Sequence, residues 1–565
     1  MAFKDTREYA YWLDDSGNNN DWQPNGGITT ESTVTDTPTP YADGGNYATL
    51  NKLSQLSTST TISNANLSAV IPASSATGKG VGTIAVSSGK WYWETTYTTS
   101  NGNYLYVGMG NPSDTNPRWL VRGSDGEVLG PTTSGSATAI RFVQGDVIGI
   151  ALDADNGKWF IRVNGTWQLS ADPVAGTGFV HSGLYGELAP RYENATGSAT
   201  QTIECNFGQR PFAYTPPTGF LPLHTGNLPD SAIVDGSEYF NTVLYTGNGS
   251  AQSITGVGFQ PDFLWAKRRT AGSHALADSV RGATKLLFTN STAAEETQSL
   301  SIQSFDADGF TVNNYANVNN SGEPLVAWNW KANGSGVSNT DGSITSTVSA
   351  NPTAGFSIVT YTGTGATATV GHGLGVAPSM IIWKRRDSTS NWYVYHKDVT
   401  PKALVLETTA GAYTTTLFNG FVSASDTLTL GAQGFNISGA SHLAYCFADV
   451  EGYSKFGSYT GNGSADGPFV YTGFRPAFIM WKRTDSSTGG EWVIQDTTRR
   501  EFNPVNVSLY PNLSNAEATG ETFRVQDTLS NGFKIRASAA QCNASGGTYI
   551  YAAFAENPFK NSLAR

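Results

Sequence analysis

Apolar and polar residues alternate along most of this chain in short runs, as they do in β-strands that bury one face. Short apolar runs in the C-terminal half occupy residues 263–265, 380–383 and 478–481. Turn residues separate such runs about every 8 to 12 residues, a spacing typical of β-sandwiches. Helical periodicity is found in the short stretch 290–299. The pattern therefore predicts an all-β protein made of several β-sandwich domains.

The C-terminal half repeats one pattern three times. A Tyr-Thr-Gly turn is followed by an apolar run, a Lys-Arg step, a Gly-Phe pair and a final alternating strand rich in aromatic residues. The turns begin at Tyr245, Tyr361 and Tyr459, the steps at Lys267, Lys384 and Lys482, and the pairs at Gly309, Gly434 and Gly532. A repeated module presents the same surface several times, which favours binding and assembly over chemistry.

The length of 565 residues is too great for a single core. We expect an N-terminal arm, a β-sandwich, a connector and three related β-sandwich modules, the first two of which are separated by an insert. The expected boundaries are 1–60 for the arm, 61–215 for the first sandwich, 216–240 for the connector, 241–335, 356–452 and 453–565 for the modules, and 336–355 for the insert.

Composition excludes several classes of protein. The net charge is −11, so binding of nucleic acid through a basic surface is not expected. No apolar run is long enough to span a membrane, and the first residues carry no apolar signal segment, which predicts synthesis in a cytoplasm. Cys205, Cys446 and Cys542 lie far apart without metal-binding spacing, and we expect them to be buried free thiols.

The segment 61–215 carries a specific set of strand and turn motifs. Gly-Lys-Trp-Tyr-Trp-Glu occupies 89–94, Gly-Asp-Val-Ile-Gly-Ile-Ala-Leu-Asp occupies 145–153, an Asn-Gly turn follows at Asn164, and Asn-Phe-Gly-Gln-Arg-Pro-Phe closes the segment at 206–212. In order and spacing these motifs resemble the SPRY domain. The resemblance implies a two-sheet sandwich whose loops bind a partner and which is not a catalyst.

The C-terminal half resembles an uncharacterised repeat domain of virion and tail proteins of marine bacteriophages. The motifs that carry this resemblance lie at 278–282 with 290–295, at 355–363, and at 503–506 with 510–512. The N-terminal residues 20–22, 36–38 and 46–51 are also similar to the segment that precedes SPRY domains in phage proteins. The resemblance implies a place in a phage particle and no defined reaction.

Candidate chemistry in the sequence is weak. The acidic turn 153–157 lacks the glutamate that an EF-hand calcium loop needs at its twelfth position, where Asn164 stands, so a hairpin turn is the better interpretation. The histidines show no metal-binding spacing. One column of the repeat holds Asp278, His396 and Asp496, and this variation does not preserve a catalytic role across the copies. We therefore expect no enzyme, no cofactor and no metal.

Aromatic and cationic residues outside the apparent core strands are the candidates for binding. Arg118, Trp119 and Trp167 fall on expected loops of the first sandwich, and Trp392 and Trp492 share one column of the repeat. Planar rings stack on sugars and anchor protein interfaces, although core packing is the alternative for each tryptophan. The Lys-Arg steps are interpreted as strands that run into solvent, with repeated cationic contacts to an acidic glycan or to a neighbouring acidic subunit as the alternative.

The N-terminal arm carries Tyr9, Tyr11 and Trp12, an aromatic group that we expect to dock on the particle. These inferences predict a non-enzymatic structural protein of a phage virion. Its expected role is a tail fibre or spike adhesin that binds a glycan or protein receptor on the host surface multivalently. Its expected partners are other virion proteins and further copies of itself, for example in a trimer. A capsid-decorating protein and a polysaccharide depolymerase are the alternatives.

Overall fold

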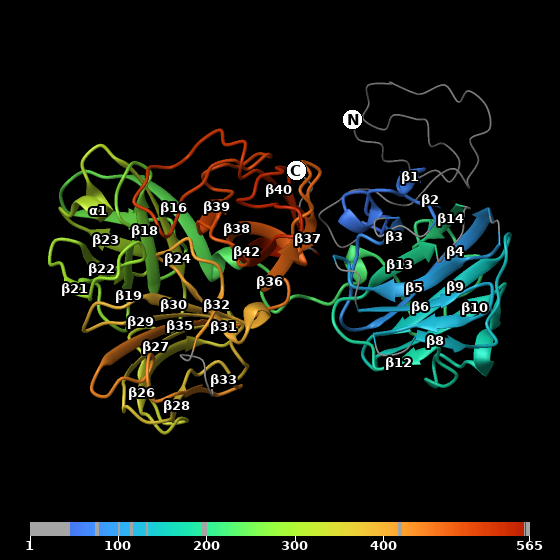
Figure 1. Cartoon of the computed structure of the whole chain (residues 1–565), viewed down its shortest axis with the longest axis horizontal. Helices are drawn as coiled ribbons and strands as arrows, with labels where there is room; N and C mark the ends of the chain where they lie inside the picture. Colours follow the sequence, from blue (N-terminus) through green and yellow to red (C-terminus); the bar gives the residue numbers. More distant parts are fainter. Residues whose placement is uncertain are drawn as a thin grey trace. The chain divides into compact units, whose positions relative to one another are not determined.

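The computed structural model describes residues 46–73, 78–99, 102–113, 117–131, 134–194, 200–415, 421–558 and 560. Contacts divide the chain into two compact units, Met1–Pro229 and Asp230–Arg565. Strands dominate both units (Figure 1), which confirms the predicted all-β class. The described helical segments are single short turns: η3 Gln55–Ser57, η4 Gln168–Ser170, η5 Thr225–Asn227, η6 Gly236–Glu238, α1 Ala316–Asn319 and η7 Lys397–Val399.

The first unit contains two antiparallel sheets. The larger has the order β1-β2-β14-β4-β9-β10-β11, with β12 paired to β10 and β15 to β4, and the smaller has the order β3-β13-β5-β6-β7-β8. The strands of the larger sheet are β1 Thr61–Ser63, β2 Ser68–Ile71, β4 Lys90–Thr99, β9 Val147–Asp153, β10 Lys158–Val163, β11 Thr166–Trp167, β12 His181–Ser182, β14 Gln201–Asn206 and β15 Leu221–Pro222. Those of the smaller sheet are β3 Lys79–Val81, β5 Leu105–Gly110, β6 Arg118–Arg122, β7 Glu127–Leu129, β8 Ser134–Ala137 and β13 Ala189–Asn194.

The Asn-Gly turn predicted at Asn164 joins β10 to β11. Val163 pairs with Thr166, and the two residues between them have φ of 46° and 82°, values that asparagine and glycine tolerate better than other residues. The structure differs from the prediction at residues 216–240, which we expected to form a connector. Its Leu221–Pro222 pairs in parallel with β4, so the part before residue 230 completes the first unit.

The second unit contains three pairs of sheets, which we call lobe 1 (240–330), lobe 2 (337–447) and lobe 3 (454–558). Each lobe has a large sheet and a three-stranded small sheet. Lobe 1 comprises β16 Phe240–Thr246, β24 Pro324–Trp330, β18 Phe263–Arg268, β19 Ala275–Asp278, β20 Lys285–Phe288 and β21 Glu296–Thr297, with β17 Gln252–Thr255, β23 Gly309–Val312 and β22 Ile302–Asp306 in the small sheet.

Lobes 2 and 3 follow the same order in their large sheets. Lobe 2 comprises β25 Val337–Asn339, β26 Ser346–Asn351, β27 Phe356–Thr362, β35 Ser441–Phe447, β29 Met380–Arg385, β30 Trp392–His396, β31 Lys402–Val405 and β32 Tyr413–Thr414, with β28 Ala368–Gly371, β34 Thr427–Leu430 and β33 Val422–Ser423. Lobe 3 comprises β36 Ser454–Thr460, β42 Thr548–Pro558, β38 Phe474–Arg483 and β39 Val493–Asp496, with β37 Phe469–Tyr471, β41 Gly532–Ile535 and β40 Gln526–Leu529.

The strand that ends in Tyr-Thr therefore lies beside the final aromatic strand in every lobe, and the Lys-Arg strand lies on the other side of that aromatic strand. The expected insert 336–355 carries β25 and β26, and β26 pairs with β27, so this segment widens the sheet of lobe 2. It is not a free linker, because its alternating side chains suit an added strand.

The Tyr-Thr-Gly turn is fixed in the same way in each lobe. The hydroxyls of Tyr245, Tyr361 and Tyr459 donate to the carbonyl oxygens of Val318, Phe435 and Cys542 at 2.7, 2.6 and 2.9 Å. Phe435 is thus the counterpart of Val318 and Cys542. The Gly-Phe pair of lobe 2 consequently differs from the pairs at Gly309 and Gly532, which open β23 and β41.

The large sheets of lobes 1 and 2 bury both faces. In β18, Leu264 packs in the core that the large sheet shares with its own small sheet, whereas Phe263 and Trp265 point into a second core. In lobe 2, Ile381 packs in the core between the large and the small sheet, whereas Ile382 points into the second core. Because the side chains of a strand alternate in direction, a continuous apolar run suits a strand with both faces covered.

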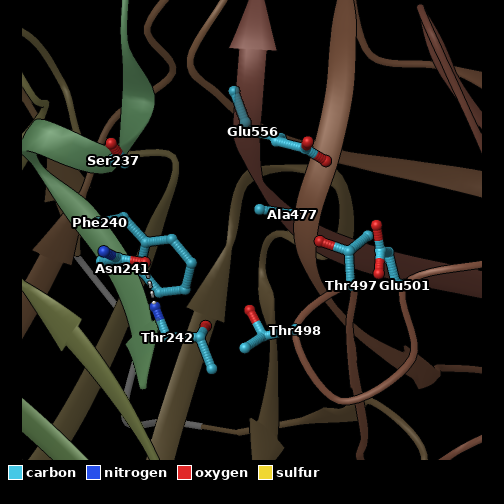
Figure 2. Close-up of a pocket in the computed structure, with 10 residues that line it drawn as sticks. Ser237, Phe240, Asn241, Thr242, Ala477, Thr497, Thr498, Glu501 and Glu556 are labelled. Carbon is cyan, nitrogen blue, oxygen red and sulfur yellow. Dashed lines mark hydrogen bonds between the residues drawn. The ribbon is translucent and has the colours of Figure 1, made fainter. Parts of the chain in front are cut away.

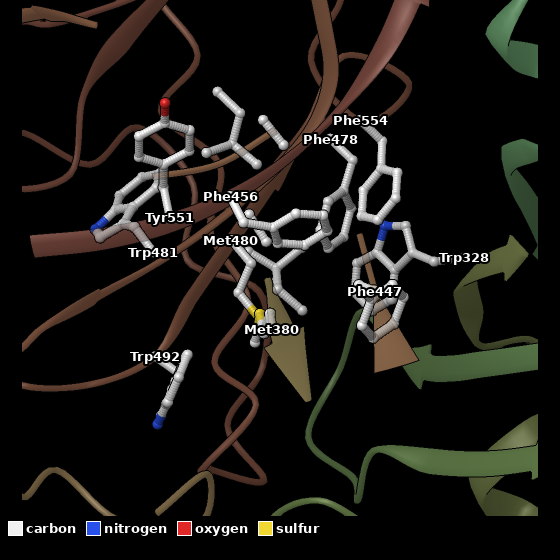
Figure 3. Close-up of a cluster of buried hydrophobic side chains, with 14 of the residues drawn as sticks. Trp328, Met380, Phe447, Phe456, Phe478, Met480, Trp481, Trp492, Tyr551 and Phe554 are labelled. Carbon is white, nitrogen blue, oxygen red and sulfur yellow. The ribbon is translucent and has the colours of Figure 1, made fainter. Parts of the chain in front are cut away.

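The second core is common to all three lobes, and Figure 3 shows side chains from each of them, among them Trp328, Phe447 and Phe456. Phe263 of lobe 1 stacks on Tyr445 of lobe 2 with ring centroids 4.2 Å apart, and the ring centroids of Phe447 of lobe 2 and Phe456 of lobe 3 are 5.8 Å apart. Phe554 of lobe 3 closes the circle, since its ring centroid lies 5.2 Å from that of Phe240 of lobe 1 and 5.6 Å from that of Trp330. The three lobes therefore form one compact unit instead of a row of separate domains.

Phe554→Ala should destabilise the second unit by about 3–5 kcal/mol, because it removes a ring that contacts all three lobes and leaves a cavity. The free energy of unfolding in urea measures the change. Phe502→Ala is the matched control: that ring is 66 % exposed, and its loss should cost less than about 0.5 kcal/mol. Equal effects of the two substitutions would contradict a shared core.

Candidate functional site

The junction between lobes 1 and 2 contains a chain of charges, of which Asp278 and Arg281 are buried and Glu295 and Arg386 are partly buried. The Arg386 guanidinium of lobe 2 donates to Glu295 of lobe 1 at 2.9 Å, and Glu295 also pairs with Arg281 at 3.1 Å. Arg281 pairs in turn with Asp278 at 2.5 Å, and Asp278 accepts a hydrogen bond of 2.8 Å from the hydroxyl of Tyr445 in lobe 2. Every charge in this chain has an opposite neighbour, which is the condition for burying charges without a large penalty.

The junction between lobes 3 and 1 repeats this arrangement. Arg269 of lobe 1 pairs with Glu517 of lobe 3 at 2.6 Å, and Glu517 pairs with Arg499 at 3.0 Å. Arg499 lies 2.6 Å from Asp496, which accepts a hydrogen bond of 3.0 Å from the indole of Trp328 in lobe 1. Asp278 and Asp496 are therefore structural acceptors at two junctions.

The third junction, between lobes 2 and 3, uses neutral groups in the same places. His396 replaces the aspartate and approaches the carbonyl oxygen of Tyr551 at 3.4 Å, while the amide of Ala412 donates to the carbonyl oxygen of Thr484 at 2.7 Å. Burial lowers the pKa of His396 to about 4, so its ring is neutral at pH 7. The position of the repeat that holds Asp278, His396 or Asp496 therefore lies at a junction in every lobe. Two of these junctions are charged at this position and the third is neutral.

Trp392 and Trp492 lie at these junctions and not on the surface. The indole of Trp392 donates to the carbonyl oxygen of Phe288 in lobe 1 at 2.9 Å, and the indole of Trp492 donates to that of Val405 in lobe 2 at 3.0 Å. Both rings are buried, so they are not available to a receptor. Each lobe contacts the next in the same sense, which closes a ring of three.

The lysines of the Lys-Arg steps also differ from the prediction, because Lys267, Lys384 and Lys482 are buried. Lys384 Nζ donates to the carbonyl oxygen of Thr292 in lobe 1 at 2.9 Å, and Lys482 Nζ to that of Thr409 in lobe 2 at 3.2 Å. Burial lowers the pKa of Lys267 to about 7 and those of Lys384 and Lys482 to about 8. Lys384 and Lys482 therefore join lobes, whereas Lys267 Nζ donates to Arg268 and Thr270 of its own lobe, and the three buried amines do not form a cationic surface.

A polar cavity of about 250 Å³ lies at the junction of lobes 3 and 1 (Figure 2). Lobe 1 contributes residues of β16 and η6, and lobe 3 contributes threonines, carboxylates and alanines. The lining residues are Ser237, Phe240, Asn241, Thr242, Ala477, Thr497, Thr498, Glu501, Ala555 and Glu556. Thr242 is buried, yet its hydroxyl has no hydrogen-bond partner among the described residues. Such a group is costly unless a ligand or water satisfies it.

In the first unit, Trp119 lies in β6 and is buried, so it is not itself a binding surface. The ring of Tyr185 meets it edge to face, with centroids 5.3 Å apart, and Tyr185 is 60 % exposed. The neighbouring Arg118 lies 4.0 Å from Glu193 and remains partly exposed. The exposed aromatic side chain at this place is thus Tyr185, which the sequence analysis missed.

Trp167 is half-buried beside a stacked arginine. The guanidinium of Arg162 lies 5.1 Å from the centroid of the Trp167 ring, 4.7 Å from that of Tyr92 and 5.2 Å from that of Tyr214. Cation–π contacts of this kind fix the ring in place. The segment 166–186 that follows β10 also exposes Leu169, Val174, Phe179 and Tyr185.

One sequence feature could have indicated Tyr185. It lies between Gly183 and Gly186, whose φ values are 73° and 77°, so the backbone turns sharply on both sides and projects the intervening ring. The aromatic residues Tyr9, Tyr11 and Trp12 lie outside the described residues. In the acidic turn, Asp153 accepts hydrogen bonds from the backbone and side chain of Asn156, as a hairpin turn requires.

No group of three or more potential metal ligands occurs within the described ranges. None of the helices in the described part of the chain is long and apolar enough to cross a membrane.

Residues 235–558 match the sequence model of a family described as "Domain of unknown function (DUF7483)". No curated protein matches the chain.

Several solved SPRY structures are similar to part of the chain. The SPRY domain of human HERC1 is 21 % identical, with a TM-score of 0.20, and the match covers 26 % of this chain and 91 % of that one. For the TRIM65 PSpry domain the identity is 15 %, the TM-score 0.22 and the coverage 28 % and 92 %. A human SPRY domain is 15 % identical, with a TM-score of 0.19, and the match covers 26 % of this chain and 94 % of that one.

Lys267→Met should remove a pH dependence of stability. The folded pKa of Lys267 is about 7, against about 10.4 for an unfolded lysine, so the unfolded chain binds an extra proton between these values and stability rises with pH. Relative to that of the variant, the free energy of unfolding of the wild type should rise by on the order of 1 kcal/mol per pH unit between about pH 7 and about pH 9.

Urea unfolding of both proteins at several pH values measures this difference, in which the titration of all other groups cancels. Lys402→Met, at an exposed lysine of β31, is the control and should show no trend. A constant difference between wild type and Lys267→Met would contradict the prediction.

Proposed function

The chain belongs to the family of the domain of unknown function DUF7483, and we propose that it is a non-enzymatic structural protein of a phage virion. In this proposal it is a tail fibre or spike that adheres to a glycan on the host surface. The observation that carries the binding role is the segment 166–186, which exposes four apolar side chains on the turns and loops that follow β10. Exposed apolar groups of this kind are typical of interaction sites.

The ring of Tyr185 supports recognition of a sugar. It is 60 % exposed, and Trp119 contacts it from within the unit, so little conformational entropy is lost when a ligand stacks on it. The partly exposed Arg118 adjoins Trp119 in β6 and offers a donor for hydroxyl or carboxylate groups. An aromatic platform beside a donor is an arrangement suited to a glycan.

The pairing of the polar groups at the junctions of the second unit supports a structural role for that unit. The carboxylates and arginines at two junctions pair with one another, and the lysines donate to carbonyl oxygens across or beside the junctions. These groups stabilise the ring instead of facing a substrate. A rigid body of this kind, carried in several copies on one particle, would bind by avidity.

Tyr185→Ala should lower the binding of the purified protein to host cells at least ten-fold, because the stacking platform is lost. Cell binding of labelled protein measures the effect, and Phe502→Ala, an exposed aromatic residue of the second unit, is the control. Wild-type protein at saturation should also block adsorption of the phage. If adsorption is unchanged, the adhesin proposal fails, and release of reducing ends from host polysaccharide would favour a depolymerase.

A further inference from the structure

The ring of three lobes has three junctions, but only two of them are crossed by a connecting segment. Lobe 1 continues into lobe 2 through 331–336, and lobe 2 continues into lobe 3 through 448–453. Lobes 3 and 1 are the last and the first along the chain. What occupies the two crossed junctions therefore indicates what would fit in the third.

Equivalent positions in the three junctions are identified by one backbone hydrogen bond. The amides of Ser279, Lys397 and Thr497 donate to the carbonyl oxygens of Asp262, Ser379 and Ala477, at 2.8, 2.9 and 2.9 Å. These three pairs lie in lobes 1, 2 and 3. Ala477 and Thr497 line the polar cavity at the junction of lobes 3 and 1.

At the junction of lobes 1 and 2 this position is filled by the connecting peptide. The amides of Ala332 and Gly334 donate to the carboxylate of Asp262 at 2.7 and 3.1 Å. The hydroxyl of Ser279 donates to the carbonyl oxygen of Gly334 at 2.6 Å. A carboxylate and a hydroxyl thus bind both kinds of main-chain group.

At the junction of lobes 2 and 3 the connecting segment fills the position with a side chain. Asp449 accepts hydrogen bonds from the hydroxyl of Ser379 at 2.8 Å and from the amide of Phe456 at 2.7 Å, and it pairs with Lys397. The connecting segment therefore fills the place in both crossed junctions, with main-chain groups at the first and with the Asp449 carboxylate at the second.

The uncrossed junction holds the cavity of about 250 Å³ instead. Its lining retains the chemistry of the crossed junctions, with Thr497 at the position of Ser279 and with the carboxylates of Glu501 and Glu556 in the wall. The buried hydroxyl of Thr242 lacks a partner there among the described residues. Glu556 also pairs with Arg475 at 3.0 Å. The hydroxyl groups of the wall suit an extended main chain, which supplies donors and acceptors in alternation.

The cavity is continuous with an edge strand. In the described part of the chain β16 pairs with β24 alone, whereas its counterpart β27 pairs with both β35 and β26. The amide of Thr242 faces the free edge, since it donates to the side chain of Asn241 at 2.8 Å and not to β24. Residue 244, two positions further on, has its amide on the same edge, and the Leu244 side chain is 41 % exposed.

We propose that β16 and the adjoining cavity bind an extended segment of a different protein, which adds to the sheet of lobe 1 as β26 adds to the sheet of lobe 2. The segment would carry small and hydroxyl side chains, as β26 does with Ser-Thr-Val-Ser-Ala-Asn, and no acidic ones, because two carboxylates line the cavity. In a second copy of this chain β26 is already paired with β27, so the occupant is assigned to another protein.

A labelled peptide of residues 345–351, with blocked termini, tests this proposal on the whole chain. Fluorescence anisotropy should show saturable binding to the wild type. Leu244→Pro removes the edge amide without touching the pairing with β24, and it should weaken binding at least ten-fold. Leu244→Lys keeps the amide and should bind the peptide with an affinity within two-fold of that of the wild type. Circular dichroism and the melting temperature check that both variants fold.

Several results would overturn the proposal. One is equal binding to the wild type and to Leu244→Pro, or no binding at millimolar peptide. Another is undiminished binding of a peptide whose alternate amides are methylated and cannot pair with an edge. The last is self-association of the chain that Leu244→Pro abolishes, which would assign the edge to a second copy. Stabilisation by glucose, galactose or N-acetylglucosamine in place of the peptide would likewise make the cavity a sugar site.

Discussion

The second unit depends on the burial of a second apolar face on its large sheets. A β-sandwich needs only one apolar face per sheet, but Phe263 and Ile382 point away from the sandwich cores of their own lobes. In isolation each lobe would expose a row of aromatic and aliphatic side chains to water, at a cost of roughly 25 cal/mol per Å². The three rows cover one another, and this shared burial fixes the arrangement of the lobes.

Polar contacts then determine which lobe meets which. Two junctions carry chains of alternating charge that end at Asp278 and Asp496, and the third uses His396 in the corresponding place. An arginine that pairs with Asp278 or Asp496 would meet the neutral His396 in place of that aspartate, and a buried unpaired charge costs several kcal/mol. The differences among the copies therefore specify a single cyclic order, whereas their common residues specify the fold of each lobe.

The sequence was sufficient to predict the strands, the Asn-Gly turn at Asn164 and the repeated turns, because these depend on local alternation and backbone preference. It was not sufficient to place Trp392, Trp492, Lys384 or Lys482, since these side chains contact another lobe more than 70 residues away. Continuous apolar runs such as 263–265 do carry information about two-sided burial, but a sandwich core alone also accounts for them. The glycines on either side of Tyr185 indicate a sharp turn, but the packing of its ring on Trp119 is a tertiary contact that the local pattern does not carry.

The arrangement of the lobes also concerns the order in which they could be encoded. In a closed ring of similar members, the junction that lacks a connecting segment is a property of the gene and not of the packing, because side chains of all three lobes share one apolar core. A circularly permuted gene that begins with lobe 2, ends with lobe 1 and joins lobes 3 and 1 by a short peptide would specify the same set of contacts. In the ring, the order of the lobes along the chain can therefore change while their arrangement in space stays the same, which is not possible for a linear row of domains.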